Sequence, residues 1–180
     1  MPKYQPMSSE IYQYILEKRL PYSKGNYLEI GSYTGGGITL LAEHFPNKNF
    51  YSIESFVQES DNSVEKFIEN TKDLDNIKLI YMNSLIFNKF LIFKSKIFDI
   101  NDMNIDTILI DGSHIYKDVL IDIDTSILLL KNKIGFIFFH DAINTKDVVL
   151  AVDEFENNYK KSILFKDIDG DAKIFITDFK

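Results

Sequence analysis

With 180 residues, 45% of them hydrophobic and 26% charged, the chain is long enough for one globular domain with a substantial core and too short for two ordinary ones. The absence of cysteine excludes disulfides, thiol nucleophiles and cysteine-ligated metal sites, so any metal must be bound through oxygen or imidazole. A formal net charge of −7 without a long basic run argues against nucleic acid as the main partner. No apolar run suits a membrane span or a secretory signal, so we expect a cytoplasmic protein that does not bind membranes.

Helical and strand patterns alternate along the chain. Residues 8–20 place apolar side chains at helical spacing with serines available as the cap, and Pro21 and Gly25 end this segment. Short apolar runs bounded by turn signals then predict strands at residues 27–30, 50–54, 77–82, 106–111, 135–139, 162–166 and 172–177. Between them lie predicted helices at residues 38–44, 62–73, 85–98, 116–130 and 144–157.

This alternation predicts a Rossmann-like, doubly wound α/β sheet of about seven strands. The run 106–111 has a continuous apolar centre, which suits burial on both faces of a parallel sheet. The short turn at 167–171 predicts that the last two strands form a C-terminal antiparallel hairpin on a mostly parallel sheet. We expect a single domain over residues 1–180, in which residues 1–24 form a helical cover and residues 25–180 the core.

A glycine-rich turn follows the first predicted strand and holds half of the 8 glycines of the chain. Glycine is needed where the backbone adopts positive φ or passes close to a ligand. The helix after the turn would point its free N–H groups at the same place, which suits a carboxylate, a ribose or a phosphate. The turn therefore predicts a binding site, and its candidate residues are Glu29, Gly31, Ser32, Tyr33, Gly35 and Gly36.

Polar residues also end the other predicted strands, at the edge where doubly wound sheets bind ligands. Glu54 follows Gly31 by about 23 residues, the distance at which an acid accepts both hydroxyls of an adenosine ribose. The remaining candidates at strand ends are Ser55, Asn83, Ser84, Asp111, His114, His140 and Asp141.

The glycine spacing is not that of dehydrogenases, because Tyr33 stands where their G-x-G-x-x-G fingerprint requires a second glycine. Glu29, Gly31 and Gly35 instead match E-x-G-x-x-x-G, the first motif of the class I S-adenosylmethionine-dependent methyltransferases, which the chain resembles. The D-G-x-H-x-Y element that begins at Asp111 and the H-D-A element that begins at His140 sharpen the resemblance. They are similar to those of small-molecule O-methyltransferases related to the macrolide-sugar and catechol enzymes, over residues 27–155.

The resemblance implies S-adenosylmethionine as the cofactor and a divalent cation held by Asp111 and Asp141, which are the counterparts of the family's acids. Hard oxygen ligands suit Mg²⁺, which would bind the substrate hydroxyl and lower its pKa. His140 is a departure, since several metal-using relatives carry an acid there; as a third candidate ligand it favours a softer ion such as Mn²⁺. Asn83 and Ser84 stand where relatives often have an acid near the adenine amine.

His114 and Asp111 are the candidate catalytic residues. An unperturbed imidazole can accept a hydroxyl proton at neutral pH, and the D-G-x-H element places His114 beside the acceptor. The acceptor is expected to be a small hydroxylated molecule such as a sugar, a phenol or a natural product. Asp118, Asp122 and Asp124 are interpreted as a solvated helix face or as local caps, outside the site.

Two other functions remain open at this point. The chain could be a Rossmann-type nucleotide-binding oxidoreductase, or a non-catalytic protein that binds an adenosyl ligand. The cover predicted for the site is short, which leaves two hypotheses about its closure: an open site, or one completed by a second subunit of a homo-oligomer.

Overall fold

The computed structural model of the protein describes residues 9–56, 62–93 and 100–180. Within these residues, seven strands form one sheet in the order β3-β2-β1-β4-β5-β7-β6. The strands are β1 (Asn26–Ile30), β2 (Phe50–Glu54), β3 (Ile77–Tyr81), β4 (Ile105–Ile110), β5 (Ile134–Phe139), β6 (Ile163–Asp169) and β7 (Ala172–Asp178). The first five are parallel, whereas β7 runs antiparallel to both β5 and β6. The predicted Rossmann-like sheet with a C-terminal antiparallel hairpin is confirmed.

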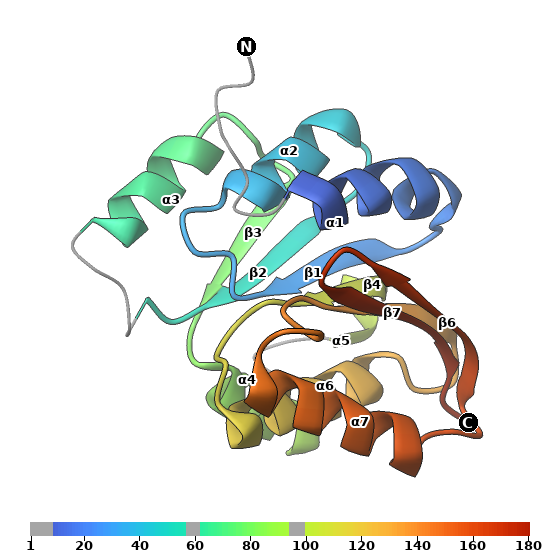
Figure 1. Ribbon diagram of the computed structural model, residues 1–180. Coiled ribbons are helices and arrows are strands. Elements are labelled where there is room, and N and C mark those ends of the chain that lie inside the picture. The colour runs from blue at the N-terminus through green and yellow to red at the C-terminus, as the bar shows by residue number, and fades with distance from the viewer. Residues whose placement is uncertain (1–8, 57–61, 94–99) are drawn as a thin grey trace.

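Helices cover both faces of the sheet (Figure 1). One face carries α1 (Ser9–Tyr14), α2 (Gly36–His44) and α3 (Ser63–Thr71). The other carries α4 (Ser84–Ile92), α5 (Ile100–Met103), α6 (Tyr116–Leu129) and α7 (Lys146–Asn158). Among the residues described, no helix combines the length and the apolar character needed to cross a membrane.

Two segments differ from the predicted helices. The segment predicted at 8–20 is α-helical only to Tyr14, after which it continues as a π-helical turn, η1 (Ile15–Arg19), and a 3₁₀ turn, η2 (Leu20–Tyr22). Pro21 lies in η2, where its missing N–H and fixed φ favour an end to the helical segment. In the segment predicted at 85–98, α4 ends at Ile92, and residues 94–99 lie outside the described residues. The four-residue helix α5 is too short to show a period and was not predicted.

The side chains of the central strand β1 alternate between two hydrophobic cores, one on each face of the sheet. Leu28 and Ile30 point to one face, where they join side chains of α4, α6 and α7. Tyr27 points to the other face, where it joins Ile11 and Ile15 from the N-terminal helical segment and side chains of α2. Because a strand turns successive side chains to opposite faces, this five-residue segment fixes the position of both helical layers.

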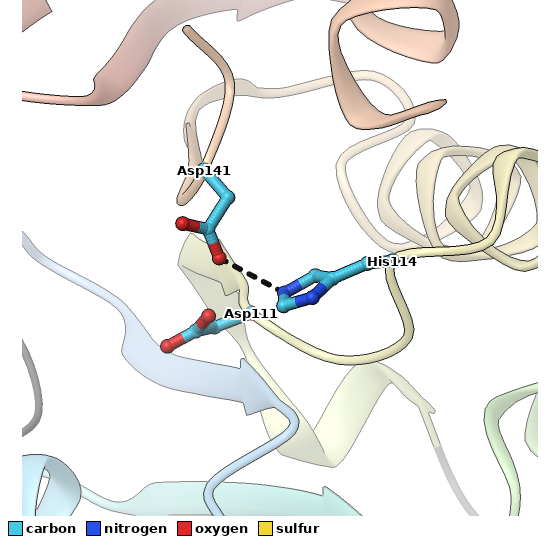
Figure 2. Close-up of side chains that lie close together, drawn as sticks. All are labelled: Asp111, His114 and Asp141. Carbon is cyan, nitrogen blue, oxygen red and sulfur yellow. Dashed lines mark ion pairs between the residues drawn. The ribbon is translucent and has the colours of Figure 1, made fainter. Parts of the chain in front are cut away.

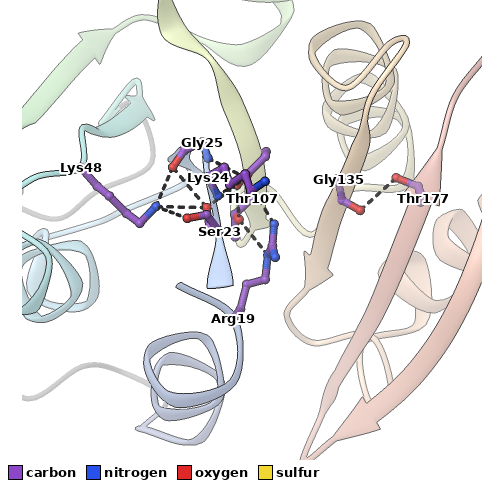
Figure 3. Close-up of polar contacts among 9 residues, drawn as sticks. Arg19, Ser23, Lys24, Gly25, Lys48, Thr107, Gly135 and Thr177 are labelled. Carbon is purple, nitrogen blue, oxygen red and sulfur yellow. Dashed lines mark hydrogen bonds and ion pairs between the residues drawn. The ribbon is translucent and has the colours of Figure 1, made fainter. Parts of the chain in front are cut away.

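A buried polar network at the amino ends of the strands ties the N-terminal segment to the sheet (Figure 3). Arg19 is 7% exposed; its guanidinium lies 3.4 Å from Asp106 and donates to the Thr107 hydroxyl at 3.2 Å. Asp106 also accepts hydrogen bonds from the Ser23 hydroxyl and the Gly25 N–H, both at 2.7 Å. These donors and the Arg19 charge lower the pKa of Asp106 although burial opposes them. The amino ends of β1 and β4 are therefore covered by polar groups of the chain itself.

Candidate functional site

A cavity of about 180 Å³ lies at the carboxyl ends of β1 to β4. Its wall is made by residues at or just after the ends of these strands and by two aspartates of α6. Those residues are Ile30, Gly31, Tyr33, Ile53, Glu54, Ser55, Met82, Asn83, Ser84, Asp111, Gly112, Ser113, Asp118 and Asp122. The fold therefore brings together many of the residues predicted to bind the cofactor, namely Gly31, Tyr33, Glu54, Ser55, Asn83, Ser84 and Asp111.

The glycine turn is shaped by close contact with the end of β4. Gly31 has φ of +90°, and a Cβ there would lie 2.3 Å from the backbone oxygen of Asp111. Gly35, the N-cap of α2, has φ of +75°. Side chains are disfavoured at both positions, which explains why glycine stands there. The turn thereby holds Asp111 against the cavity.

Glu54 is fixed by backbone donors at the end of β2. Its Oε2 accepts from the Tyr33 N–H at 3.0 Å, and its Oε1 accepts from the N–H groups of Ser55 and Phe56 at 2.8 and 3.0 Å. An ionised carboxylate has about four acceptor positions, so these three bonds orient the group and leave about one acceptor position unused. Glu54 can therefore accept a ribose hydroxyl from the cavity.

Four predicted cofactor residues do not line this cavity. Glu29 is fully buried, and its carboxyl accepts hydrogen bonds from Tyr27 and Tyr12 at 2.7 and 3.1 Å. Burial raises the pKa of Glu29 to about 8. The Ser32 hydroxyl accepts from Ser52 at 2.8 Å, while Gly35 and Gly36 form the start of α2. Glu29 thus connects β1 with the N-terminal helical segment, and its role as a cofactor residue stays a prediction.

Asp111, His114 and Asp141 converge beside the cavity (Figure 2). Asp111 comes directly after β4 and lines the cavity, and Asp141 comes two residues after β5. The Nε2 atom of His114 lies 2.9 Å from Oδ2 of Asp141, and the His114 side chain is 54% exposed. Both predicted catalytic residues, Asp111 and His114, therefore lie together with the predicted metal ligand Asp141, and Asp111 is itself a predicted ligand.

His140 lies between the two acids. Its Nδ1 atom is 3.0 Å from Oδ1 of Asp111 and 3.1 Å from Oδ2 of Asp141. The hydrogen bond with Asp111 raises the pKa of His140 to about 9, although burial opposes this shift. The imidazolium therefore neutralises part of the acidic charge.

Asp171 is a residue that the sequence reading missed. It lies in the turn between β6 and β7, where its Oδ1 accepts from the Asp141 N–H at 3.2 Å and its backbone oxygen accepts from the Ala142 N–H at 2.9 Å. Asp141 has φ of +55°, which is unfavourable for a residue with a side chain, so these bonds help to hold it. The signal was the turn itself, whose Asp-Ile-Asp-Gly-Asp sequence was interpreted only as a hairpin connection.

Oxygen and imidazole donors are close enough here for a divalent cation. The ligand atoms of Asp111, His114 and Asp141 all lie within 4.8 Å of one another, and so do those of His140, Asp141 and Asp171. Carboxylates and imidazoles together fit Mn²⁺ better than Mg²⁺, which prefers oxygen alone.

The interpretation of Asp122 as part of a solvated helix face was wrong. Asp122 is 1% exposed and lines the cavity, as does Asp118 one turn earlier on α6. Burial raises the pKa of Asp122 to about 7. The buried stripe of α6 also contains Val119 and Ile123, so Asp122 has the spacing of a core position, and that was the signal in the sequence. Asp124, in contrast, is exposed.

Comparisons with solved structures show where this fold occurs. A candidate O-methyltransferase from Klebsiella pneumoniae is 15% identical, with a TM-score of 0.64 over 94% of this chain and 79% of that one. CalS11, a TDP-rhamnose 3′-O-methyltransferase of calicheamicin biosynthesis, is 10% identical, with a TM-score of 0.62 over 87% and 72%. Fibrillarin in its complex with Nop5p is 14% identical, with a TM-score of 0.58 over 87% and 73%. Likeness at this level of identity shows the fold alone.

Sequence comparison identifies the family. Among curated proteins, no sequence matches the chain significantly. A family profile described as a methyltransferase domain matches residues 28–142, which contain the glycine turn, Glu54, Asp111 and Asp141. This match covers more than half of the chain and agrees with the E-x-G-x-x-x-G and D-G-x-H elements. The chain therefore belongs to the methyltransferase domain family and is a class I S-adenosylmethionine-dependent methyltransferase.

Proposed function

We propose that the protein transfers the methyl group of S-adenosylmethionine to a hydroxyl of a small molecule. The observation that carries the proposal is the pairing of His114 with Asp141 next to Asp111, which itself lines the same cavity as Glu54. Glu54 and the glycine turn would hold the adenosyl part of the cofactor. The imidazole then lies at the same edge of the sheet as the cofactor, where an acceptor hydroxyl would meet the methyl group.

In the proposed reaction, the acceptor oxygen attacks the methyl carbon in line with the carbon–sulfur bond. The oxygen–carbon bond forms as the carbon–sulfur bond breaks, and its electron pair stays on sulfur to give S-adenosylhomocysteine. The Nε2–H of His114 donates to Asp141, so Nδ1 is the nitrogen that can accept the hydroxyl proton. Much of the rate enhancement would come from holding the two reactants in line.

A divalent cation, Mn²⁺ or Mg²⁺, is part of the proposal. Asp111 and Asp141, with His140, would hold it, and the bound ion would supply charge that favours the deprotonated hydroxyl. Asp171 would keep Asp141 in position, because its carboxylate accepts a hydrogen bond from the backbone N–H of Asp141. Glu54 and Gly31 belong to the donor site alone, whereas Asp111 belongs both to the cavity wall and to the acidic cluster.

The acceptor class is inferred from charge and from structural relatives. The net charge of −7 disfavours a nucleic-acid acceptor. CalS11, which has this fold, is named for methylation of a sugar hydroxyl. A sugar, a phenol or a related natural product in the cytoplasm fits these observations, with the site either open or completed by a second subunit.

Calorimetric titration with S-adenosylhomocysteine tests the donor site. We expect micromolar binding of this product and none of NAD⁺, and a change in the affinity for the product when Mn²⁺ replaces EDTA. Absence of product binding, or preference for NAD⁺, would overturn the proposal in favour of a nucleotide-binding oxidoreductase.

Transfer of a labelled methyl group to a panel of hydroxylated acceptors tests the reaction. His114→Ala is expected to lower kcat at least about a hundredfold while product affinity stays unchanged. His44→Ala, which removes an exposed imidazole at the end of α2, is the matched control. Equal turnover by the His114 variant and wild type would refute the role of general base.

A further inference from the structure

The strand at one end of the sheet, β6, presents an apolar edge. Among the residues described, β7 is its one neighbouring strand. Three large apolar side chains of β6 lie in solvent, since Leu164, Phe165 and Ile168 are 57%, 52% and 53% exposed. An edge strand has backbone N–H and C=O groups that no neighbouring strand satisfies, so an apolar edge strand is a template for pairing with another strand.

The strand at the other end of the sheet, β3, is less suited to such pairing. It has five residues, whereas β6 has seven, and its one exposed large apolar side chain is that of Tyr81. The ring of Tyr81 packs against Phe56 of the same chain, with centroids 5.5 Å apart. In Figure 1, β6 lies at the margin of the sheet that is remote from α3.

The charges along the β6 edge complement one another when two copies run antiparallel. Two exposed lysines, Lys160 and Lys161, come just before the strand. Asp169 is the last residue of the strand, and Asp171 lies in the turn that follows. In an antiparallel pair the basic start of each strand lies along the acidic end of the other, whereas a parallel pair would bring like charges together. Antiparallel pairing of identical strands is the arrangement of a two-fold symmetric dimer.

The lysine within β6 does not oppose this pairing. Lysine on an edge strand commonly protects it from other strands. The Nζ atom of Lys166, however, donates to both carboxylate oxygens of Glu156 on α7, at 2.9 and 2.7 Å. Its charge is therefore already balanced within the chain.

Two-fold symmetry also restricts how the two strands align. An axis normal to the sheet keeps each side chain on its own face, so one residue of β6 lies opposite its own copy. Lys166 is the midpoint of β6 (Ile163–Asp169), so full overlap of the strands centres the pair on this residue. Ile168 of each copy then lies opposite Leu164 of the other, and apolar cross-strand pairs stabilise a sheet.

We propose that β6 is the interface of a homodimer, in which it pairs antiparallel with β6 of a second copy and joins the two sheets into one. With Lys166 at the centre, Lys161 of the second copy would lie opposite Asp171, whose carboxylate holds the N–H of Asp141. The interface would therefore border the acidic cluster of the site. The inference goes beyond the proposed function, since it depends on neither the cofactor nor the reaction.

Sedimentation equilibrium at micromolar concentration tests for the dimer. Wild type is expected to have twice the mass of the chain. Ile168→Lys removes the apolar pair with Leu164, and we expect it to raise the Kd of the dimer at least about tenfold. Ile68→Lys, at a 56% exposed position on α3, is the matched control and should associate like wild type. A monomeric wild type would overturn the inference, and so would an Ile168→Lys variant that associates as tightly as wild type.

Cysteine cross-linking locates the interface. The chain contains no cysteine, so a disulfide between two chains must join introduced residues. Lys166→Cys should cross-link on mild oxidation, because opposite residues of antiparallel strands have Cα atoms about 4.5–5.5 Å apart, within the range of a disulfide. Phe165→Cys and Asp167→Cys cover a shift of the axis by one residue, and Lys78→Cys, at an exposed position on β3, is the control that should stay uncrosslinked. Cross-linking of Lys78→Cys instead, or of none of the three β6 variants, would overturn the inference.

Discussion

Replacement of Glu29 by glutamine should make the protein less sensitive to rising pH. Burial raises the pKa of Glu29 from an ordinary value of 4.5 to about 8, so between these values the folded state binds a proton that the unfolded state has lost. Folding stability then falls as pH rises through this window, by about 1.4 kcal/mol for each pH unit. Between pH 5 and pH 7 the loss is about 3 kcal/mol. Glutamine has no proton to lose, and it can still bond to the hydroxyls of Tyr12 and Tyr27.

Urea unfolding of wild type and Glu29→Gln at pH 5, 6, 7 and 8 measures the effect. The free energy of unfolding of Glu29→Gln, relative to that of wild type, should increase by about 3 kcal/mol from pH 5 to pH 7 and should increase further up to pH 8. Asp122, whose pKa is raised to about 7, is present in both proteins, so its contribution cancels in the difference. Glu43→Gln, on the exposed face of α2, controls for the loss of one negative charge. A pH-independent difference between Glu29→Gln and wild type would refute the reasoning.

Two further substitutions test contacts at the two edges of the sheet, one at the amino ends of the strands and one at the carboxyl ends beside the cavity. Asp106→Asn removes the charge beside the buried Arg19 guanidinium, and we expect a loss of about 3 kcal/mol in urea unfolding; a loss below about 1 kcal/mol would contradict a structural role for the pair. Gly31→Ala places a Cβ 2.3 Å from the Asp111 backbone oxygen at φ of +90°, so we expect a loss of at least about 3 kcal/mol, or a displaced Asp111 seen as weaker product binding in calorimetry. Unchanged stability and unchanged binding together would contradict that close approach.

The sheet was predictable because its strands are short apolar runs with glycine at their boundaries, as at Gly31 and Gly135. The strand-end rule then located the cavity wall at Glu54 and Asp111, because parallel strands bring their carboxyl ends to one edge. The buried hydrogen-bonded position of Glu29 was harder to predict from the sequence. Its hydrogen bond to Tyr12 joins positions 17 residues apart in the chain and depends on how the N-terminal segment packs.

Aspartates were harder to assign than glycines. Asp122 and Asp124 are the same residue type on one helix, yet one is buried and the other exposed, and only the direction of the helix face separates them. Asp171 reaches the site because β7 lies beside β5, an order that local sequence patterns do not specify. Long-range strand order therefore decided which acidic residues belong to the site.

Because β4, β5 and β7 are neighbours in the sheet, His140 lies close to Asp111, Asp141 and Asp171. The imidazole of His140 contacts Asp111 and Asp141, and Asp171 supplies a further carboxylate nearby. We predict that wild type binds Mn²⁺ more tightly than Mg²⁺, and that His140→Asp raises Mg²⁺ affinity at least about tenfold, because another hard oxygen replaces a nitrogen ligand. Calorimetry with each ion alone measures this without turnover, and His44→Asp controls for added negative charge. Equal Mg²⁺ affinity in wild type and His140→Asp would mean that His140 lies outside the coordination sphere, which would leave Asp111 and Asp141 as the predicted cation ligands.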